Sequence, residues 1–252
     1  MKIALCISGQ PRSVAATFPF IDRHIIQPNQ PDVFIHSWID DNIKGHIPIA
    51  ANGLMASDVV PHDIEEVILR LYKPTTAIFE PQRRFDEKDY NERKETYIKP
   101  KNSLSQRYSI QKSIELATQH STYDIIIRMR FDFAIRKTIN AANFPLDKIT
   151  TPNDCPWPGG INDQFAIGNQ ANMVWYSNLF DAIDDLYHVH NLSFCDEVLL
   201  AKHLSLGGIE TNPVHIPYTM YRCNGASNER YVTSDYINDP ATDIIKWPEK
   251  LL

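Results

Sequence analysis

Cysteine is scarce in this chain of 252 residues, and long apolar runs and an excess of positive charge are missing. The four cysteines lie far apart and include no Cys-x-x-Cys pair, which argues against a structural zinc site and fits reduced thiols. No apolar run approaches the roughly 18 residues of a membrane-spanning helix, and the first residues lack a basic segment followed by a signal-type apolar segment. We therefore expect a cytoplasmic protein without a transmembrane segment.

The charge balance and the overall composition narrow the class of protein further. The formal net charge is −6, which argues against a general nucleic-acid-binding protein. Hydrophobic residues make up 43% of the chain and charged residues 22%, close to the averages for globular proteins, so the composition argues against disordered and fibrous classes. The length suits one large core, and we expect residues 1–252 to form a single domain.

The first half of the chain alternates between strand-like and helix-like patterns. Helical spacing separates the apolar stretches, for example after Ser103–Gln106, which has the form of a capping box. This alternation predicts right-handed crossovers and an α/β fold with a mostly parallel, Rossmann-like sheet between two layers of helices, an architecture typical of nucleotide binding. The predicted strands are Lys2–Ser8, Asp32–Trp38, Thr76–Glu80 and a fourth strand that begins at Tyr123.

The fourth predicted strand changes character near its end. The sequence from Tyr123 to Phe133 begins with an apolar run, which predicts a central strand buried on both faces, and then becomes charged. Because side chains alternate along a strand, we expect Arg128, Arg130 and Asp132 on one face at the carboxyl end, where open α/β sheets bind ligands. A salt-bridged strand end without a ligand is the alternative.

The turn after the first strand, Ser8–Arg12, is a second candidate ligand site. Glycine allows a backbone to approach a ligand closely and arginine can reach a phosphate, although an ordinary strand-to-helix turn has the same pattern. The end of the strand at Asp32–Trp38 resembles another ligand-facing loop. In a parallel sheet the helix after Ser103 begins at the same edge, so Tyr108 and Lys112 are either ligand contacts or plain surface.

The second half of the chain has a less regular pattern. A loop with proline and glycine, Cys155–Gly160, precedes a predicted short strand at Ile161–Asn169. Helical spacing over Met173–Tyr187 predicts a core helix, and Val214–Ile216 is a predicted late strand. Between them, the adjacent acids at 196 and 197 open another predicted helix, where they either complement the helix dipole or have a catalytic role.

Taken together, these motifs resemble nucleotide-sugar-dependent glycosyltransferases of the GT-A fold. The closer likeness is to small transferases of bacteria and large DNA viruses that open with Ser-Gly-Gln-Pro-Arg and carry Arg-x-Arg-x-Asp on the fourth strand. It spans nearly the whole chain and implies a donor-binding half at 1–135 and an acceptor-binding half at 136–252. The segments that carry the resemblance are Ser8–Arg12, Asp32–Trp38, Arg128–Asp132, Asn162–Phe165 with Gly168, and Asp196 with Glu197.

The resemblance implies an activity, the inverting transfer of a hexosyl or deoxyhexosyl group from a nucleoside-diphosphate sugar to a hydroxyl of a glycan or lipid-linked glycan. Such a reaction belongs to the synthesis of surface polysaccharides or glycoprotein glycans, and it leaves open a peripheral contact with a membrane. The resemblance assigns to the donor nucleotide the residues Ser8, Gly9, Gln10, Arg12, His36, Tyr108, Lys112, Arg128 and Arg130. It assigns to the sugar or acceptor the residues Trp157, Gly160 and Asp163.

Metal binding is the point at which the chain departs from the family pattern. Asp132 matches the last acid of the family's Asp-x-Asp motif, which implies Mn²⁺ or Mg²⁺, but Arg130 stands in place of the first acid. One carboxylate can suffice, because these cations keep several waters and also bind diphosphate oxygens. His215, on the late predicted strand, is either a second metal ligand or a structural histidine.

The chemistry of the implied reaction explains why these residue types would be needed. Breaking the sugar–phosphate bond leaves negative charge on the diphosphate, which a metal ion or arginines such as Arg128 and Arg130 can stabilise. The acceptor hydroxyl must lose a proton, and in inverting members of the fold the base lies at a helix N-terminus, the position that Asp196 and Glu197 match. We favour Asp196, because its shorter side chain is held more precisely.

Two other functions fit parts of the pattern. A sugar nucleotidyltransferase would share the α/β half but should have a Gly-rich phosphate loop followed by a lysine, whereas Ser8–Arg12 contains one glycine and no lysine. A non-enzymatic nucleotide- or carbohydrate-binding module is the other alternative. Such a module would not require both the Arg-x-Arg-x-Asp sequence and the adjacent acids at 196 and 197.

Overall fold

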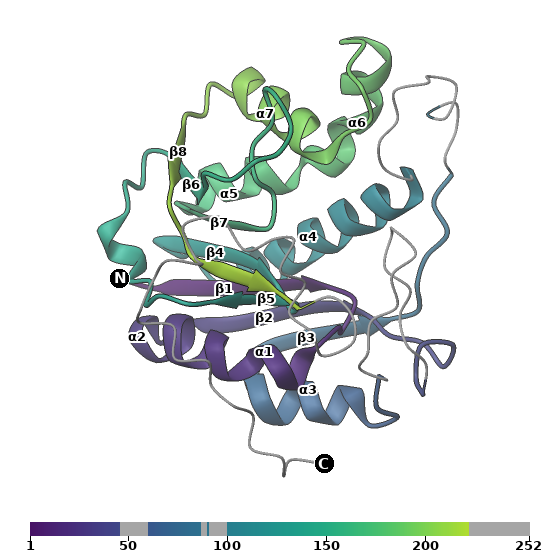
Figure 1. Cartoon of the computed structure of the whole chain (residues 1–252), viewed down its shortest axis with the longest axis vertical. Helices are drawn as coiled ribbons and strands as arrows, with labels where there is room; N and C mark the ends of the chain where they lie inside the picture. Colours follow the sequence, from purple (N-terminus) through teal and green to yellow (C-terminus); the bar gives the residue numbers. More distant parts are fainter. Residues whose placement is uncertain (46–59, 87–89, 91–99, 222–252) are drawn as a thin grey trace.

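The computed structural model describes residues 1–45, 60–86, 90 and 100–221. These residues contain a seven-stranded, mostly parallel mixed sheet of order β3-β2-β1-β4-β7-β6-β8, flanked by helices (Figure 1). The expected α/β class is therefore confirmed. The strands of this sheet are β1 Ile3–Gly9, β2 Asp32–Trp38, β3 Thr76–Glu80, β4 Ile125–Arg130, β6 Ile149–Pro152, β7 Phe165–Gly168 and β8 Thr211–Val214.

The parallel part of the sheet consists of β3, β2, β1 and β4, which are the four strands that the sequence predicted. β1 lies between β2 and β4, and residues 4–7 have no exposed surface. Burial on both faces explains why this strand is an unbroken apolar run. Ser8 is paired with His36 on one side and with Arg130 on the other, so the carboxyl ends of the three strands lie side by side.

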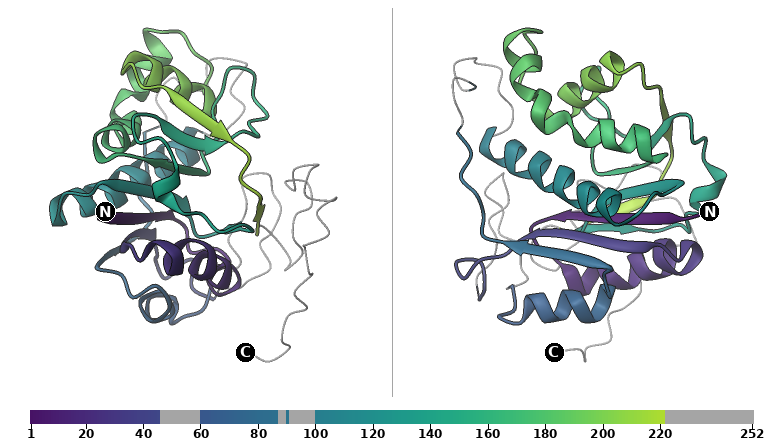
Figure 2. Two further views of the ribbon diagram at one scale, coloured as in Figure 1. Left: turned by 90° about the vertical axis from the view of Figure 1, so that its left-hand side faces the viewer. Right: turned by 180° about the vertical axis from the view of Figure 1, so that it is seen from behind.

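Two layers of helices enclose the sheet. α1, Val14–Ile21, and α3, Ile64–Tyr72, lie against one face and pack with alternate strand residues such as Leu5 (Figures 1 and 2). α4, Pro100–His120, crosses β1 and β2 on the other face, where it covers the intervening residues such as Cys6. This division follows from the alternation of side chains along a strand.

The start of α4 differs from the prediction. The helix begins at Pro100 and not after Ser103, so the predicted capping box is wrong. Proline suits a first helical turn because its missing N–H group would have no partner there. Ser103 lies inside the helix, and its hydroxyl donates a hydrogen bond to the carboxylate of Asp196. The predicted core positions Ile110 and Ile114 are buried.

The second half of the chain extends the sheet with strands of mixed direction. β7 runs antiparallel to β4, with Phe165 opposite Met129, and β6 runs antiparallel to β7 and parallel to β8. The strand predicted over 161–169 is therefore shorter, and the preceding segment turns instead, since Gln164 N donates to Asn162 Oδ1 at 2.8 Å. The late strand ends at Val214, before the position where the sequence predicted its middle.

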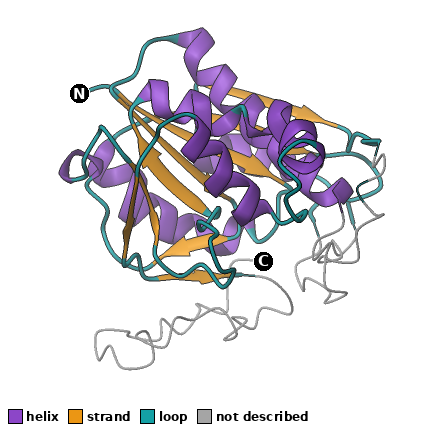
Figure 3. Cartoon of the chain, turned by 90° about the horizontal axis from the view of Figure 1, so that it is seen from above, coloured by secondary structure: helices purple, strands orange, loops and turns teal. Residues whose placement is uncertain are grey.

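Three helices follow β7 and lie over the sheet in the view of Figure 3. The single helix predicted over 173–187 is two helices that meet at Asn178, α5 (Gln170–Ser177) and α6 (Leu179–His188). Together with α7, Asp196–Leu206, they pack against α4 and share a buried core with β1. This core joins the two halves of the chain.

A second, two-stranded sheet that the sequence did not predict pairs β5, Phe133–Ile135, with β9, Tyr218–Met220, in antiparallel fashion. Short helical segments complete the described residues, namely a π-helix at Asp22–Ile26, α2 at Gln27–Asn29 and a 3₁₀-helix at Ala141–Asn143. Among the helices of residues 1–45, 60–86 and 100–221, none combines the length and the apolar character needed to cross a membrane.

Candidate active site

Most of the candidate residues gather at one edge of the sheet. β1, β2, β3 and β4 all end there, and β7 starts there because it is antiparallel to β4. The loop before β7 is joined to the first turn of α7, since Ile161 N donates to the carbonyl oxygen of Glu197 at 3.0 Å. Asp163 and Glu197, which are far from Arg130 in the sequence, are thereby brought to the carboxyl end of β4.

A buried ion-pair network lies beneath this edge. Arg107 of α4 donates from Nη2 to Asp163 Oδ2 at 2.8 Å and from Nε to Asp196 Oδ1 at 2.9 Å. Gln106 Nε2 also donates to Asp163 Oδ2 at 2.6 Å, and Ser103 donates to Asp196 Oδ2. Burial alone would lower the pKa of Arg107, but the carboxylates of Asp196 and Asp163 outweigh it and raise the pKa. The arginine therefore stays a cation and locks both aspartates.

Arg130 and Asp132 form a two-pronged ion pair at the end of β4. Arg130 Nε lies 2.8 Å from Asp132 Oδ1, and Nη2 lies 2.7 Å from Oδ2. Arg130 Nη1 also donates to Gln164 Oε1 at 3.1 Å. The strand ends at Arg130 and Asp132 lies in the turn beyond it, but the two side chains meet as the alternation predicted. The Asp132 side chain is 3% exposed and that of Arg130 is 15% exposed.

Arg128 lies deeper than Arg130 and has no exposed surface. It donates to the backbone carbonyl of Asp163, while its Nε and Nη2 atoms have no hydrogen-bond partner among the described residues. Burial is the main cause of its lowered pKa. Arg128 can therefore influence a ligand at this edge through its charge, but it does not contact solvent itself.

Glu197 has surroundings unlike those of the neighbouring aspartates. Burial, and then the charge of Asp163, raise the pKa of Glu197 from 4.5 to about 7. Its Oε2 accepts a hydrogen bond from the Cys195 thiol at 3.3 Å. A carboxylate of this pKa can take up and release a proton at neutral pH. Both oxygens of Asp196 are held by Arg107 and Ser103, so the geometry favours Glu197 over Asp196 as a base.

Gly160 lies against Glu197 and has no room for a side chain. A Cβ atom at this position would lie 2.9 Å from Glu197 Cβ and 3.0 Å from Cys155 Sγ. The turn that carries it is closed by the Gly160 N–H, which donates to the Trp157 carbonyl at 2.9 Å. Trp157 is half-buried. The loop Cys155–Gly160, which carries the predicted acceptor residues Trp157 and Gly160, is thus packed directly on the first turn of α7.

The Gly9 turn ends β1 at the same edge. Gly9 has a φ of 113°, which a residue with a side chain rarely adopts, and Ser13 has a φ of 52°. The Gly9 N–H donates to Ser109 Oγ at 2.9 Å, and Ser37 Oγ donates to the Gly9 carbonyl at 2.9 Å. Within the turn, Arg12 Nε donates to Gln10 Oε1 at 3.0 Å. The turn is therefore held at both ends by neighbouring elements.

His36 is wholly buried, so it does not face a ligand as the sequence suggested. Its Nδ1 lies 2.8 Å from Ser109 Oγ and its Nε2 lies 2.7 Å from Glu80 Oε1. Burial lowers the pKa of His36, so the ring is neutral and links these two groups as one donor and one acceptor. Because Ser109 also accepts from Gly9, His36 helps to position the Gly9 turn.

Tyr108 directly follows Arg107 on α4, and Lys112 lies about one turn further along the helix. Tyr108 stacks on Trp38 with ring centroids 5.5 Å apart, and the Arg83 guanidinium lies 4.6 Å from the Tyr108 ring centroid. Lys112 Nζ donates to Glu115 Oε2 at 2.6 Å and is half-buried. These residues form an aromatic and cationic border beside the ends of β2 and β3.

The predicted metal ligands do not form a metal site as they stand. Arg130 engages both carboxylate oxygens of Asp132. His215 follows β8 and is exposed, so the prediction that it lies on a strand is wrong. In the parts of the chain that the structure describes, no three His, Cys, Asp or Glu side chains are grouped to hold a cation. The residues present therefore do not fit Mn²⁺ or Mg²⁺ without a change at Asp132.

Sequence reasoning did not assign a role to the centre of the network, Arg107, or to Gln164. A signal for Arg107 was present, because it lies at helical spacing between Leu104 and Ile110, both of which are buried core positions. A charged residue on an apolar stripe must find partners inside the protein. The partners themselves lie in distant segments and could not be read from this pattern.

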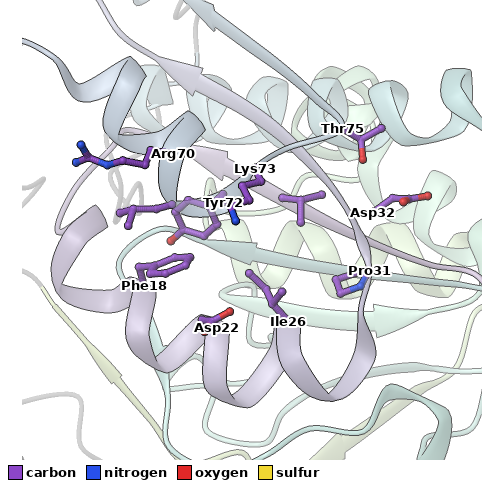
Figure 4. A pocket seen from close by; sticks show the side chains of 11 residues that line it. Phe18, Asp22, Ile26, Pro31, Asp32, Arg70, Tyr72, Lys73 and Thr75 are labelled. Atoms are coloured by element: carbon purple, nitrogen blue, oxygen red, sulfur yellow. The ribbon is translucent and has the colours of Figure 1, made fainter.

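A cavity of about 630 Å³ lies at the opposite edge of the sheet, near the starts of β2 and β3 (Figure 4). Phe18, Tyr72 and charged side chains such as Asp22, Arg70 and Lys73 line it. None of the candidate residues lines this cavity or a second one of about 470 Å³ beside the C-terminal end of α7.

Comparison with known proteins does not assign the chain to a family. No protein-family model matches the chain, and no curated protein shows significant similarity to it.

Proposed function

We propose that this protein is a nucleotide-sugar-dependent glycosyltransferase of the GT-A type. It moves a sugar from a nucleoside-diphosphate donor, bound by residues 1–135, to a hydroxyl of a glycan or lipid-linked glycan, bound by residues 136–252. The observation that carries the proposal is the position of Glu197, a half-buried carboxylate with a pKa of about 7 at the edge of the sheet where the arginines of β4 end.

In the proposed reaction the acceptor oxygen attacks the anomeric carbon of the donor sugar. The bond from that carbon to the phosphate oxygen breaks, and its electron pair stays on the nucleoside diphosphate. The hydroxyl proton passes to Glu197, which acts as the general base. Attack from the side opposite the phosphate inverts the configuration of the sugar. The cationic end of β4 stabilises the charge that develops on the leaving group.

The buried aspartates act in this proposal through Glu197. Asp163 is one cause of the raised pKa of Glu197, after burial. Arg107 forms ion pairs with both Asp163 and Asp196 and so fixes their positions near the base. Asp196 is therefore a positioning residue, since its oxygens are engaged by Arg107 and Ser103. This arrangement pairs both aspartates with Arg107 and leaves Glu197 as the carboxylate with the raised pKa.

The donor side of the proposal rests on the Gly9 turn and on the sequence likeness of Ser8–Arg12 to the family. Hydrogen bonds from Gly9 to Ser109 and from Ser37 to Gly9 fix the backbone of this turn. A fixed turn with an unhindered glycine allows the backbone to approach a phosphate group closely, and a Cβ atom placed on Gly9 would have no neighbour within 4 Å apart from the adjoining residues. The turn stands beside Arg130, because Ser8 is paired with that residue.

The proposal is tested by measuring release of nucleoside diphosphate from UDP-, GDP-, CDP- and dTDP-sugars in the presence of saccharide acceptors. We expect release from donors of one nucleotide class, and Glu197→Gln should lower turnover by about 10²- to 10⁴-fold while donor binding is kept. Glu66→Gln, at an exposed position of α3, is the matched control and should have no effect.

Two outcomes would reject the proposal. Failure to release any nucleoside diphosphate from a folded protein would favour the non-enzymatic binding module. Release of pyrophosphate from a nucleoside triphosphate and a sugar phosphate would indicate a nucleotidyltransferase instead.

A further inference from the structure

The ion pair between Arg130 and Asp132 stands where the resemblance implies a divalent cation. We propose that the Arg130 guanidinium takes the place of this cation and holds the diphosphate of the donor, so that nucleotide binding requires no metal. This inference rests on the proposed transferase function, and it assigns the diphosphate group to a particular side chain. It follows from the contacts of Arg130 and Asp132 and from the charge of Arg128.

A metal ion at Asp132 would compete with Arg130 for the same carboxylate. Its two oxygens lie 2.8 and 2.7 Å from Arg130 Nε and Nη2, a geometry that uses the full width of the carboxylate. The Asp132 side chain is 3% exposed, so a cation that displaced Arg130 would have to separate a largely buried pair. Removing one partner from a buried ion pair leaves the other charge uncompensated, which is strongly unfavourable.

Arg130 is fixed in a way that suits phosphate binding. Asp132 and Gln164 accept from Nε, Nη1 and Nη2, so the plane of the guanidinium is set by three contacts. The further N–H groups on Nη1 and Nη2 lie in this same plane, and the side chain keeps 15% of its surface exposed at the ligand edge. A planar guanidinium with fixed N–H directions matches the paired oxygens of a phosphate, and little flexibility is lost on binding.

The charge behind Arg130 also favours an anion. Arg128 lies in the same strand and on the same face, and within the described residues it has no ion pair, since its hydrogen bond goes to the Asp163 backbone carbonyl. Two guanidinium groups thus stand at the end of β4, and Asp132 is paired directly with one of them, Arg130. Asp163 and Asp196 also act on Arg130 through their charge, but Arg107 pairs with both, so Arg130, with Arg128 behind it, supplies the positive charge that a diphosphate would meet at this strand end.

The test is the binding of UDP, GDP, CDP and dTDP by calorimetry, in buffer with excess EDTA, with Mg²⁺ and with Mn²⁺. We expect one nucleoside diphosphate to bind with a Kd that is the same within about twofold in all three buffers. Arg130→Lys keeps the positive charge but loses the planar contacts, and it should weaken binding by about 10- to 100-fold. Arg70→Lys, at an exposed position near the opposite edge, is the matched control.

A second variant tests the same idea in the reverse direction. Arg130→Asp restores two acids at this strand end, and its nucleotide binding should now require Mn²⁺ or Mg²⁺. Circular dichroism and thermal unfolding of both variants establish that they are folded before binding is compared. If Arg130→Asp does not fold, the Arg130→Lys comparison alone decides.

Different experimental results would reject the role of Arg130 and the transferase function. Nucleotide binding that occurs with Mn²⁺ or Mg²⁺ but not in EDTA overturns the role of Arg130 and leaves the transferase function standing. Binding that is unchanged in Arg130→Lys overturns the role of Arg130 as well. No binding of any of these nucleotides in any buffer overturns both proposals.

Discussion

Arg107 on α4 and Asp196 at the start of α7 form an ion pair, with Nε 2.9 Å from Oδ1 and side chains that are 1% and 7% exposed. The same guanidinium holds Asp163 in the loop before β7. One side chain therefore fixes three segments that meet at the candidate site. Because Glu197 is the next residue after Asp196, its position depends on this contact.

Removing Arg107 should destabilise the fold strongly. Arg107→Met keeps the volume of the side chain but leaves the carboxylates of Asp163 and Asp196 buried without a cation. We expect the free energy of unfolding to fall by about 3–5 kcal/mol, measured by chemical denaturation. Lys148→Met, which removes the exposed pair with Glu210, is the matched control and should change little. An equally small effect at Arg107 would contradict its central role.

The proposed transferase activity should rise with pH through neutrality. Glu197 must be ionised to accept a proton, and its pKa is raised to about 7. We therefore expect kcat/KM to increase about tenfold per pH unit below this value and to level off above it. Glu197→Asp should keep this dependence and Glu197→Gln should lose it along with most of the activity. A profile that is flat or that falls over the same range would exclude Glu197 as the base.

The same residue should make the stability of the fold depend on pH. The folded protein holds a proton on Glu197 up to a pKa of about 7, whereas in the unfolded chain the carboxyl ionises near its ordinary 4.5. The folded state therefore binds more protons between these values, and its stability falls as the pH rises through this window. Glu197→Gln removes this loss and should be more stable than the wild type above pH 7.

The size of this gain should be roughly 2–3 kcal/mol, with no further change at higher pH. The gain should disappear once the pH is below the ordinary value of a glutamate, where both states are protonated. Urea denaturation of both proteins across this range measures the difference. A constant difference at every pH would mean that the substitution acts through packing and that Glu197 has an ordinary pKa.

The adjacent glycines Gly159 and Gly160 should respond differently to substitution by alanine. Gly160→Ala introduces a Cβ that overlaps Glu197 Cβ, and it should cost about 1–3 kcal/mol of stability and lower kcat by displacing the base. Gly159 has a φ of 74° but open space around it, so Gly159→Ala should cost about 1 kcal/mol through backbone strain and leave kcat unchanged. Similar kcat values for the two variants would refute the contact.

The parallel half of the sheet could be predicted closely because its signal is local. β2 and β3 have the predicted bounds. β2 is buried over Val33–Trp38, whereas β3 is a partly buried edge strand that was recognised from its short run of β-branched and aromatic residues. In the second half, the strands β6, β7 and β8 have four residues each, and their mixed directions depend on pairing with distant segments. Runs of this length carry too little periodicity to define a strand.

The candidate site was predicted as a set of residues but not as a set of contacts. Alternation along β4 placed Arg130 and Asp132 on one face and left open both a ligand site and a salt-bridged strand end, and the structure shows the ion pair between the two side chains. Likewise, Ser103 has the sequence context of a helix cap, but a contact with Asp196, distant in the sequence, competes for its hydroxyl. At the positions where charged groups are buried, contacts with distant segments determine the partners, and local sequence patterns do not reveal them.

Because β7 runs antiparallel to β6, the segment between these two strands is a loop whose sequence can be replaced. The segment 153–164 leaves the sheet after β6 and returns to the same edge at β7, and its neck is closed by Asn162 Nδ2, which donates to Asp154 Oδ1 at 3.0 Å. Its length can therefore change without shifting the register of any strand, and longer loops cost little additional closure entropy. Divergent copies of this chain could acquire new partners by replacing residues 155–161, beyond this neck, while Asp163 and its ion pair with Arg107 are kept.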